Sequence, residues 1–294
     1  MFLRSVVVRL FLLLALAVSF DAQTPVAHPT STFESVVAAR FSKGDPAWKF
    51  EWFCPVSTDI VAARVLREYG AMFVASEAVI LAPTCIYPGE TSVIEFRKRL
   101  PTKSLVIAGV NVTLQTPAAE ALQRAVMQAE ELGMRISAYD GAIAGSRSYG
   151  DTLMLWNGRF FSGLDYWVRR GRLTEADRLA VSGMDLHKRI AQILTWESQG
   201  IYFSTDRTRS IFSSTAPPGS SQHLSMIAFD VAEYGRTEIR EILRENGWHQ
   251  TVVGDPLHFT FLGLQENELT MRGLRLVERG GNRYWVPTLV PIMR

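Results

Sequence analysis

The sequence has few lysines, few cysteines and no internal repeat, and these shortages narrow the class of protein. Five lysines occur among 294 residues, and none follows a serine at the Ser-x-x-Lys spacing, so the nucleophile of penicillin-binding proteins is absent. A formal net charge of +2 suggests neither nucleic acid nor an acidic membrane surface as a partner. We therefore expect a globular protein with one large domain or two smaller ones.

The first residues predict export. Arg4 and Arg9 precede an apolar run over residues 10–18, which is shorter than the about 20 residues that span a membrane. Residues 1–22 are therefore predicted to be a signal peptide, with small residues near Ser19 and at Ala22 offering cleavage positions; the alternative is a retained N-terminal anchor. We expect a periplasmic or extracellular protein without stable membrane insertion after cleavage.

The chain has two cysteines, Cys54 and Cys85. In an oxidising compartment they can form one disulfide, and the alternative is two buried thiols. The predicted export favours the disulfide.

Two short segments near the C-terminal end combine residue types that bind metal ions. His223 and Asp230 lie in the run SQHLSMIAFD, and Asp255 and His258 lie in the run GDPLHF. A catalytic zinc needs three nitrogen or oxygen ligands, an open position for water, and a nearby carboxylate that takes the proton of that water. His223, Asp230 and His258 can supply the ligands, and Asp255 can act as the base.

These side chains converge only if the chain bends twice. His223 and Asp230 would face opposite ways along one straight strand. We therefore expect His223 in a loop after the upstream Pro-Pro-Gly run, and Asp230 on a strand over residues 227–231. Asp255 and His258 would also point apart on a strand, but the glycine and proline that flank Asp255 predict a turn.

The two segments resemble motifs of the zinc D-alanyl-D-alanine carboxypeptidases of the vancomycin-resistance type and of related L-alanyl-D-glutamate endopeptidases. That family carries Ser-x-His-x-x-Gly-x-Ala-x-Asp followed by Glu/Asp-x-x-His, with a Gly-Trp segment before the second motif. The matching residues are Ser221, His223, Ala228, Asp230, Gly247, Trp248, Asp255 and His258. The family's Ser-Gly-Tyr-Arg-Ser element resembles residues 144–149, and the resemblance implies that Arg147 holds the substrate carbonyl and its developing oxyanion.

The sequence departs from the family pattern at four places. Met226 replaces the usual glycine, Gln222 stands where glutamate is common, and Ser146 replaces the tyrosine of the arginine element. Residues 171–209 form an insertion between Arg147 and His223. None of these changes removes a predicted ligand, but the contacts around His223 and the substrate specificity are expected to differ.

The resemblance implies a zinc metallopeptidase acting on peptidoglycan peptides of the cell wall, with D-alanyl-D-alanine carboxypeptidase as the first expectation. Asp255 in place of glutamate leans toward the alternative, an L-alanyl-D-glutamate endopeptidase. An alternative of another class is a catalytically silent, zinc-stabilised wall-binding protein. Asp255 can also serve only as a hydrogen-bond partner of a ligand, and Arg207 and Arg209 are further candidates for the role of Arg147.

The fold class is predicted to be α+β, because helices and short strands mix without regular βαβ alternation. The resemblance implies a small antiparallel sheet flanked by helices, with zinc on one sheet face, as in hedgehog and D,D-peptidase domains. We expect an accessory region over residues 23–105, the catalytic domain over residues 106–263, and a C-terminal hairpin extension over residues 264–294. His28, His187 and His249 are expected to be surface or core residues.

Local patterns predict several elements. Residues 24–45 are expected to form a loose lead-in, and Trp52, Phe53 and Phe73 to lie in the core. Helices are predicted over residues 58–69, 116–133, 153–167, 174–200 and 237–246, strands over residues 72–81 and 134–138, and a hairpin over residues 274–286.

Overall fold

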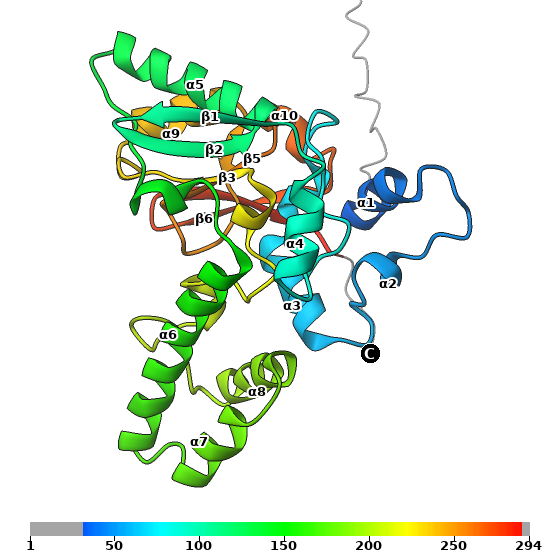
Figure 1. Ribbon diagram of the computed structural model, residues 1–294, viewed down its shortest axis with the longest axis vertical. Coiled ribbons are helices and arrows are strands. Elements are labelled where there is room, and N and C mark those ends of the chain that lie inside the picture. Colours follow the sequence, from blue (N-terminus) through cyan, green and yellow to red (C-terminus); the bar gives the residue numbers. More distant parts are fainter. Residues whose placement is uncertain (1–31, 290–294) are drawn as a thin grey trace, which may run out of the picture.

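The computed structural model describes residues 32–289, and it has an α+β fold (Figure 1). The predicted signal peptide and His28 lie outside the described residues. A two-stranded antiparallel hairpin and a five-stranded mixed sheet are flanked by helices. The hairpin pairs β1 (Thr102–Ile107) with β2 (Val110–Gln115). Within the described residues, no helix is long and apolar enough to cross a membrane.

The larger sheet has the strand order β3-β5-β4-β7-β6. Its strands are β3 (Ala228–Asp230), β4 (Trp248–Gln250), β5 (His258–Phe261), β6 (Leu274–Arg279) and β7 (Asn282–Pro287). The predicted C-terminal hairpin is confirmed as β6 and β7. The expected antiparallel pairing holds for the other neighbouring strands of this sheet, but β7 lies parallel to β4, with Gln250 opposite Tyr284, so the sheet is mixed.

Helices surround both sheets. α5 contacts the β1–β2 hairpin and α9, and α9 contacts β4. The body contains α1 (Phe33–Ser42), α2 (Phe50–Phe53), α3 (Ile60–Tyr69), α4 (Glu90–Arg97), α5 (Thr116–Glu131), α9 (Thr237–Glu245) and α10 (Glu266–Leu269). Four short 3-10 segments are η1 (Gly70–Val74), η2 (Gly141–Ala144), η3 (Ile211–Ser213) and η4 (Gln222–Ser225).

A helical arm projects from this body, and it contains most of the predicted insertion (Figure 1). Its helices are α6 (Tyr149–Arg169), α7 (Glu175–Ser182) and α8 (Leu186–Ser198). The capping box predicted at Thr174 is confirmed. The helix predicted from there to residue 200 is two helices, because Asp185 caps a new one by accepting from the Lys188 amide at 2.9 Å. The arm packs around a second core cluster that it shares with α3 and η3, and Trp156, Phe160 and Phe203 are fully buried in it.

Three local predictions are wrong. Residues 72–81 contain the end of η1 and a turn instead of a strand. The buried apolar run over residues 72–75 is too short for its periodicity to distinguish a strand from a 3-10 helix, and residues 77, 78 and 80 are exposed. Residues 134–138 form only one isolated bridge, between Ala138 and Val231. The loose lead-in contains α1, whose Phe33 and Val37 are buried.

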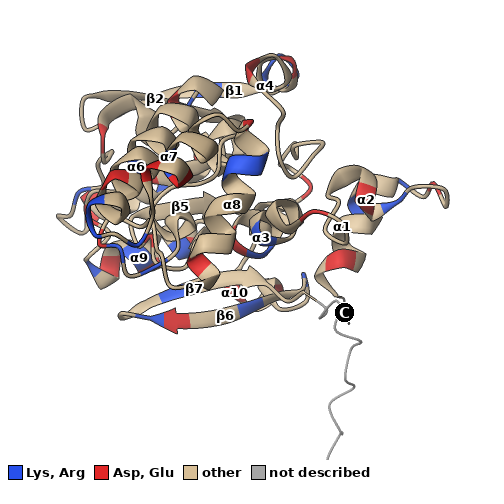
Figure 2. Ribbon diagram, turned by 90° about the horizontal axis from the view of Figure 1, so that it is seen from below, with Lys and Arg blue, Asp and Glu red and all other residues tan. Residues whose placement is uncertain are grey.

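Two of the three aromatic predictions and the disulfide prediction are confirmed, and the prediction for Trp52 is wrong. Phe53 and Phe73 lie in the core as expected, but Trp52 is 65% exposed. Cys54 and Cys85 form the predicted disulfide, which joins the end of α2 to the loop before α4. Basic and acidic residues are interspersed over the helices and strands (Figure 2), in line with the small net charge.

Candidate metal centre

The three predicted ligands come together from three elements. Asp230 ends β3 and His258 begins β5, and the antiparallel register places these two residues directly opposite each other. His223 reaches the same point from η4, which the sequence predicted as a loop. All three side chains are buried, and their ligand atoms lie within 4.8 Å of one another. This group can hold a metal ion.

The atoms that face one another form a small triangle. His223 Nε2 lies 3.1 Å from His258 Nδ1 and 3.3 Å from Asp230 Oδ1. His258 Nδ1 lies 3.0 Å from the same Asp230 oxygen. Each side of the triangle therefore joins two atoms that can donate an electron pair to one cation.

The opposite ring nitrogens show which tautomer each histidine adopts. His223 Nδ1 faces the Gly145 carbonyl at 3.3 Å, and His258 Nε2 faces the Gln222 Oε1 atom at 2.7 Å. Both oxygens only accept hydrogen bonds, so these outer nitrogens carry the protons of the neutral imidazoles. His223 Nε2 and His258 Nδ1 are then bare lone pairs. With the Asp230 oxygen, three acceptors converge without a hydrogen between them, and a cation bound among them would offset their repulsion.

The charges at this point agree with the neutral tautomers. Burial lowers the pKa of His223 to about 4, Arg147 adds to the effect, and Asp230 opposes it. Burial alone raises the pKa of Asp230, but His223 and His258 outweigh it and hold that pKa well below its usual range. Asp230 is therefore a carboxylate and His223 a neutral imidazole near neutral pH, the forms in which these side chains bind a metal ion.

Arg147 reaches the centre, but its guanidinium contacts a ligand. Its Nη2 atom pairs with Asp230 Oδ2, the oxygen that faces away from the triangle, and its Nε donates to the Ile143 carbonyl at 3.1 Å. Arg147 directly precedes Ser148, which caps α6. In this conformation Arg147 orients Asp230. Arg207 points elsewhere and donates to Ser162, whereas Arg209 pairs with Asp206 at 3.5 Å and its Nη1 atom lies beside Gly254, the residue before Asp255.

Asp255 lies in the predicted turn beside the triangle. Gly254 before it has φ +97°, a left-handed conformation that favours glycine. The Asp255 carboxylate is partly exposed, and within residues 32–289 it makes no hydrogen bond or ion pair. Burial raises the pKa of Asp255 to about 6, with the carboxylate of Asp230 adding to the shift and His258 and Arg147 opposing it. An unpaired carboxylate with a raised pKa is suited to accept and return a proton.

The backbone at Met226 adopts a conformation that favours glycine, the residue that the resembled motif has at this position. Met226 has φ 56° and ψ 36°, so the residue after η4 adopts the left-handed conformation that glycine adopts without strain. A non-glycine residue there costs roughly 1–2 kcal/mol. The side chain of Met226 is 7% exposed, and its burial offsets that cost.

A matched pair of variants can separate these two effects. Met226→Ala and Met226→Gly both remove the buried side chain, but only glycine relieves the backbone. We expect both to lower the free energy of unfolding, with Met226→Gly more stable than Met226→Ala by about 1 kcal/mol. Urea unfolding monitored by circular dichroism measures the difference. An alanine variant as stable as the glycine variant contradicts this account.

Sequence reasoning missed two residues that hold the centre from outside. Arg97 of α4 donates to the His223 carbonyl through Nη2 and to the Leu224 carbonyl through Nε, both at 3.0 Å, and to the Arg147 carbonyl. Gln222 contacts His258, although its neighbour in sequence is His223. Arg97 is 126 residues from His223, so no local pattern connects them.

The histidines outside the motifs have ordinary roles where the structure describes them. His187 is exposed and lies 3.0 Å from Asp59. His249 is buried on β4, and its Nε2 donates to the Leu264 carbonyl at 2.9 Å. Burial lowers the pKa of His249 to about 4, with the Leu264 carbonyl partly opposing the shift.

This histidine gives the fold a pH dependence with a defined sign. Its pKa is about 4 in the folded state and 6.5 in the unfolded state, so the unfolded state binds the proton first as the pH falls. We expect stability to decrease below pH ~6.5, by up to about 3 kcal/mol at pH ~4. His249→Gln keeps an N–H donor without a titration, so the difference in unfolding free energy between wild type and variant should shrink with falling pH. A constant difference from pH 7 to pH 4 contradicts this assignment.

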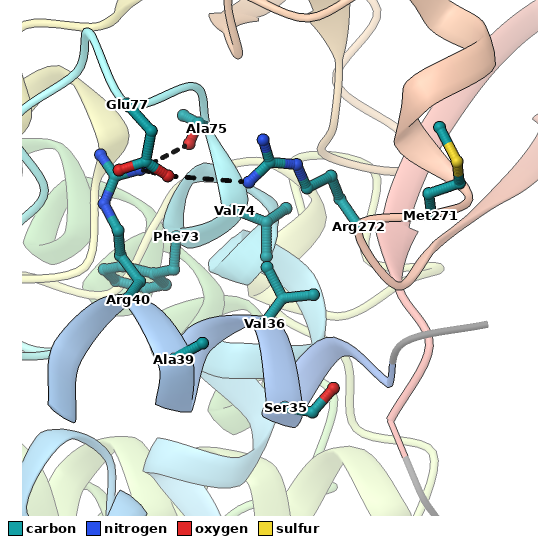
Figure 3. A pocket seen from close by; sticks show the side chains of 10 residues that line it. All are labelled: Ser35, Val36, Ala39, Arg40, Phe73, Val74, Ala75, Glu77, Met271 and Arg272. Atoms are coloured by element: carbon teal, nitrogen blue, oxygen red, sulfur yellow. Dashed lines mark hydrogen bonds and ion pairs between the residues drawn. The ribbon is translucent and has the colours of Figure 1, made fainter. Parts of the chain in front are cut away.

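A cavity of about 450 Å³ lies apart from these residues, between α1, η1 and Met271–Arg272 (Figure 3). Its charged side chains partner one another, since Glu77 pairs with Arg40 and lies 3.8 Å from Arg272. Arg40 also donates to the Val79 carbonyl at 2.7 Å. None of its lining residues belongs to the metal centre, and the arrangement suggests a structural role for Arg40.

Comparisons with known proteins give no family. No family model matches the chain, and no curated protein matches it. The arguments for function therefore depend on the residues and their geometry.

Proposed function

We propose that the protein is a zinc-dependent metallopeptidase that hydrolyses peptidoglycan stem peptides, with D-alanyl-D-alanine carboxypeptidase as the leading activity. The observation that carries the proposal is the convergence of three bare acceptor atoms beside an unpaired carboxylate. In this proposal His223, Asp230 and His258 bind the ion, and Asp255 acts as the general base and then the general acid. The proposal includes a hedgehog/D,D-peptidase-like arrangement of the fold and export to the periplasm or cell wall.

The triangle is slightly smaller than a tetrahedral zinc site, so the ligands would move apart by a few tenths of an ångström around the ion. Zinc–nitrogen and zinc–oxygen bonds of about 2.0–2.2 Å at tetrahedral angles separate neighbouring ligands by roughly 3.3–3.6 Å. The three separations are 3.0, 3.1 and 3.3 Å. Two imidazoles and one carboxylate also match the donor types of catalytic zinc, and three protein ligands leave a fourth position for water.

The residues divide the work of peptide hydrolysis. A zinc ion bound here supplies Lewis-acid activation of water and of the peptide carbonyl. Asp255 accepts the proton of the attacking water and returns it to the leaving amine, so no covalent enzyme intermediate forms. Arg147 keeps Asp230 in position through their ion pair, and the resemblance implies that the same guanidinium stabilises the developing oxyanion of the substrate.

The second candidate activity is an L-alanyl-D-glutamate endopeptidase. Asp255 supports the endopeptidase activity, because aspartate at this position is more typical of the endopeptidase branch than of the carboxypeptidase branch. Both activities share the same ion and the same proton transfer, and they differ in the peptide bond that enters the site.

One digest distinguishes the candidates. Purified protein loaded with zinc is incubated with muropeptides, and the products are identified by mass. Loss of one D-alanine from pentapeptides, abolished by a chelator and by His223→Ala, supports the leading proposal, and cleavage within the stem supports the endopeptidase. His187→Ala is the matched control, because this exposed histidine lies outside the centre and its variant should retain activity. Stoichiometric zinc with wall binding but no hydrolysis indicates a zinc-stabilised binding protein.

A further inference from the structure

The amide of Gln222 occupies the point where the metal centre meets the N-terminal region. Its Oε1 atom accepts from His258 Nε2 at 2.7 Å, from the Thr251 hydroxyl at 3.3 Å, and from the Thr260 hydroxyl. Its Nε2 atom donates to the Tyr69 carbonyl at 2.9 Å. Gln222 is 1% exposed, and Thr251 and Thr260 are fully buried, so water cannot replace a lost partner.

The Tyr69 carbonyl determines which way the amide points. A carbonyl only accepts, so the NH2 group of Gln222 must face Tyr69 and the amide oxygen must face His258. The reversed amide would place two acceptors against each other at Tyr69 and two N–H groups against each other at His258. Tyr69 is itself fixed, because it ends α3 and its hydroxyl donates to the Phe212 carbonyl of η3.

This chain of contacts reaches the metal-binding nitrogen. The amide oxygen requires a proton on His258 Nε2, and that proton leaves Nδ1 as the bare atom in the triangle. We infer that Gln222 is a positioning residue that fixes the tautomer and orientation of His258, and that the Tyr69 backbone of the N-terminal region fixes Gln222. The inference rests on the proposed zinc site and assigns part of its affinity to a residue outside the ligand set.

The inference also gives the N-terminal region a role in the site. Within the described part of this region, residues 32–105, no side chain belongs to the ligand group, and its sequence carries no motif with chemistry of its own. Through Tyr69 and Arg97, however, this region contacts Gln222 and the carbonyls of His223 and Leu224. The region completes the metal centre instead of lying beside it.

Three variants test the inference through metal affinity. Gln222→Met keeps the side-chain length but removes both the acceptor and the donor, and zinc affinity should fall about 10–100-fold. Gln222→Glu keeps an acceptor for His258, so it should retain affinity within about tenfold of wild type. Gln199→Met is the matched control at an exposed glutamine, and its affinity should not change. The measurement is competition for zinc with a chromophoric chelator, on full-length protein whose fold is checked by circular dichroism.

A second measurement reports on His258 without metal. The imidazole ¹⁵N chemical shifts of the zinc-free protein identify which ring nitrogen carries the proton. We expect the Nε2–H form in wild type and in Gln222→Glu, and a mixture of tautomers in Gln222→Met. If Gln222→Met does not fold, Thr260→Val with the same two measurements replaces it, with a smaller loss of affinity expected.

The outcomes separate this inference from the proposed function. If wild type binds zinc and folded Gln222→Met binds it equally well with the same tautomer, Gln222 is only a packing residue and the inference is wrong. If wild type does not bind zinc, the proposed function fails. In that case an Nε2–H tautomer that depends on Gln222 still supports the positioning role, and one that does not depend on Gln222 overturns it.

Discussion

Replacing Asp255 with asparagine should reduce the rate of D-alanine release by about 10²–10⁴-fold, the usual contribution of a positioned general acid–base group. Asparagine has nearly the same shape as aspartate, but it cannot accept the proton of the attacking water. The Asp255 carboxylate makes no hydrogen bond or ion pair to the rest of the described chain, so the substitution removes little structural support. The measurement is kcat with a pentapeptide substrate at saturating zinc.

Zinc content distinguishes the two roles that Asp255 can have. As the base, Asp255 lies outside the ligand set, and Asp255→Asn should bind zinc as wild type does. If Asp255 only supports a ligand, Asp255→Asn should bind zinc more weakly than wild type, and added zinc should restore its activity. A fall in kcat of less than tenfold at full zinc occupancy would remove Asp255 from the mechanism. Asp165→Asn, at an exposed position of α6, is a suitable control for the loss of one carboxylate.

Replacing Arg97 with methionine should lower the free energy of unfolding by about 3–5 kcal/mol, because three carbonyls lose a charged hydrogen-bond donor. Those carbonyls belong to Arg147, His223 and Leu224, so one side chain joins the arginine element to the first metal motif. Burial lowers the pKa of the Arg97 guanidinium, with Glu90 partly opposing the shift. The variant should also bind zinc more weakly, since η4 is no longer held in place.

A neighbouring arginine supplies the control. Arg99 is exposed and stacks over the Phe96 ring, with its guanidinium carbon 5.8 Å from the ring centroid. Arg99→Met should change the free energy of unfolding by less than about 1 kcal/mol. Urea unfolding of both variants measures the contrast. Equal stabilities for the two variants would show that the carbonyls of the metal loop find other partners.

The metal ligands could be predicted from the sequence because each motif is local. His223 and Asp230 are seven residues apart, and the turn signals around Asp255 show how the second motif bends. The register of β3 with β5 then follows from pairing two short strands. The carboxylate and imidazole types alone limit the chemistry to metal binding or proton transfer.

The supports of the ligands could not be predicted, because they come from distant parts of the chain. Gln222 contacts Tyr69 across 153 residues, and Arg97 contacts His223 across 126. Local patterns contain no information about such pairs. The failure at residues 72–81 has a related cause, since a buried apolar run takes its conformation from its neighbours in space and not from its own period.

The long separation between ligands and supports has a consequence for the order of folding. Contacts between residues far apart in sequence form late, because the intervening chain must first lose its conformational freedom. The tautomer of His258 is therefore set only when residues 69 and 258 share one folded body, and a nascent or partly folded chain has no prepared site. Metal uptake should be one of the last steps of maturation, so the compartment in which the chain completes folding determines which ion it acquires.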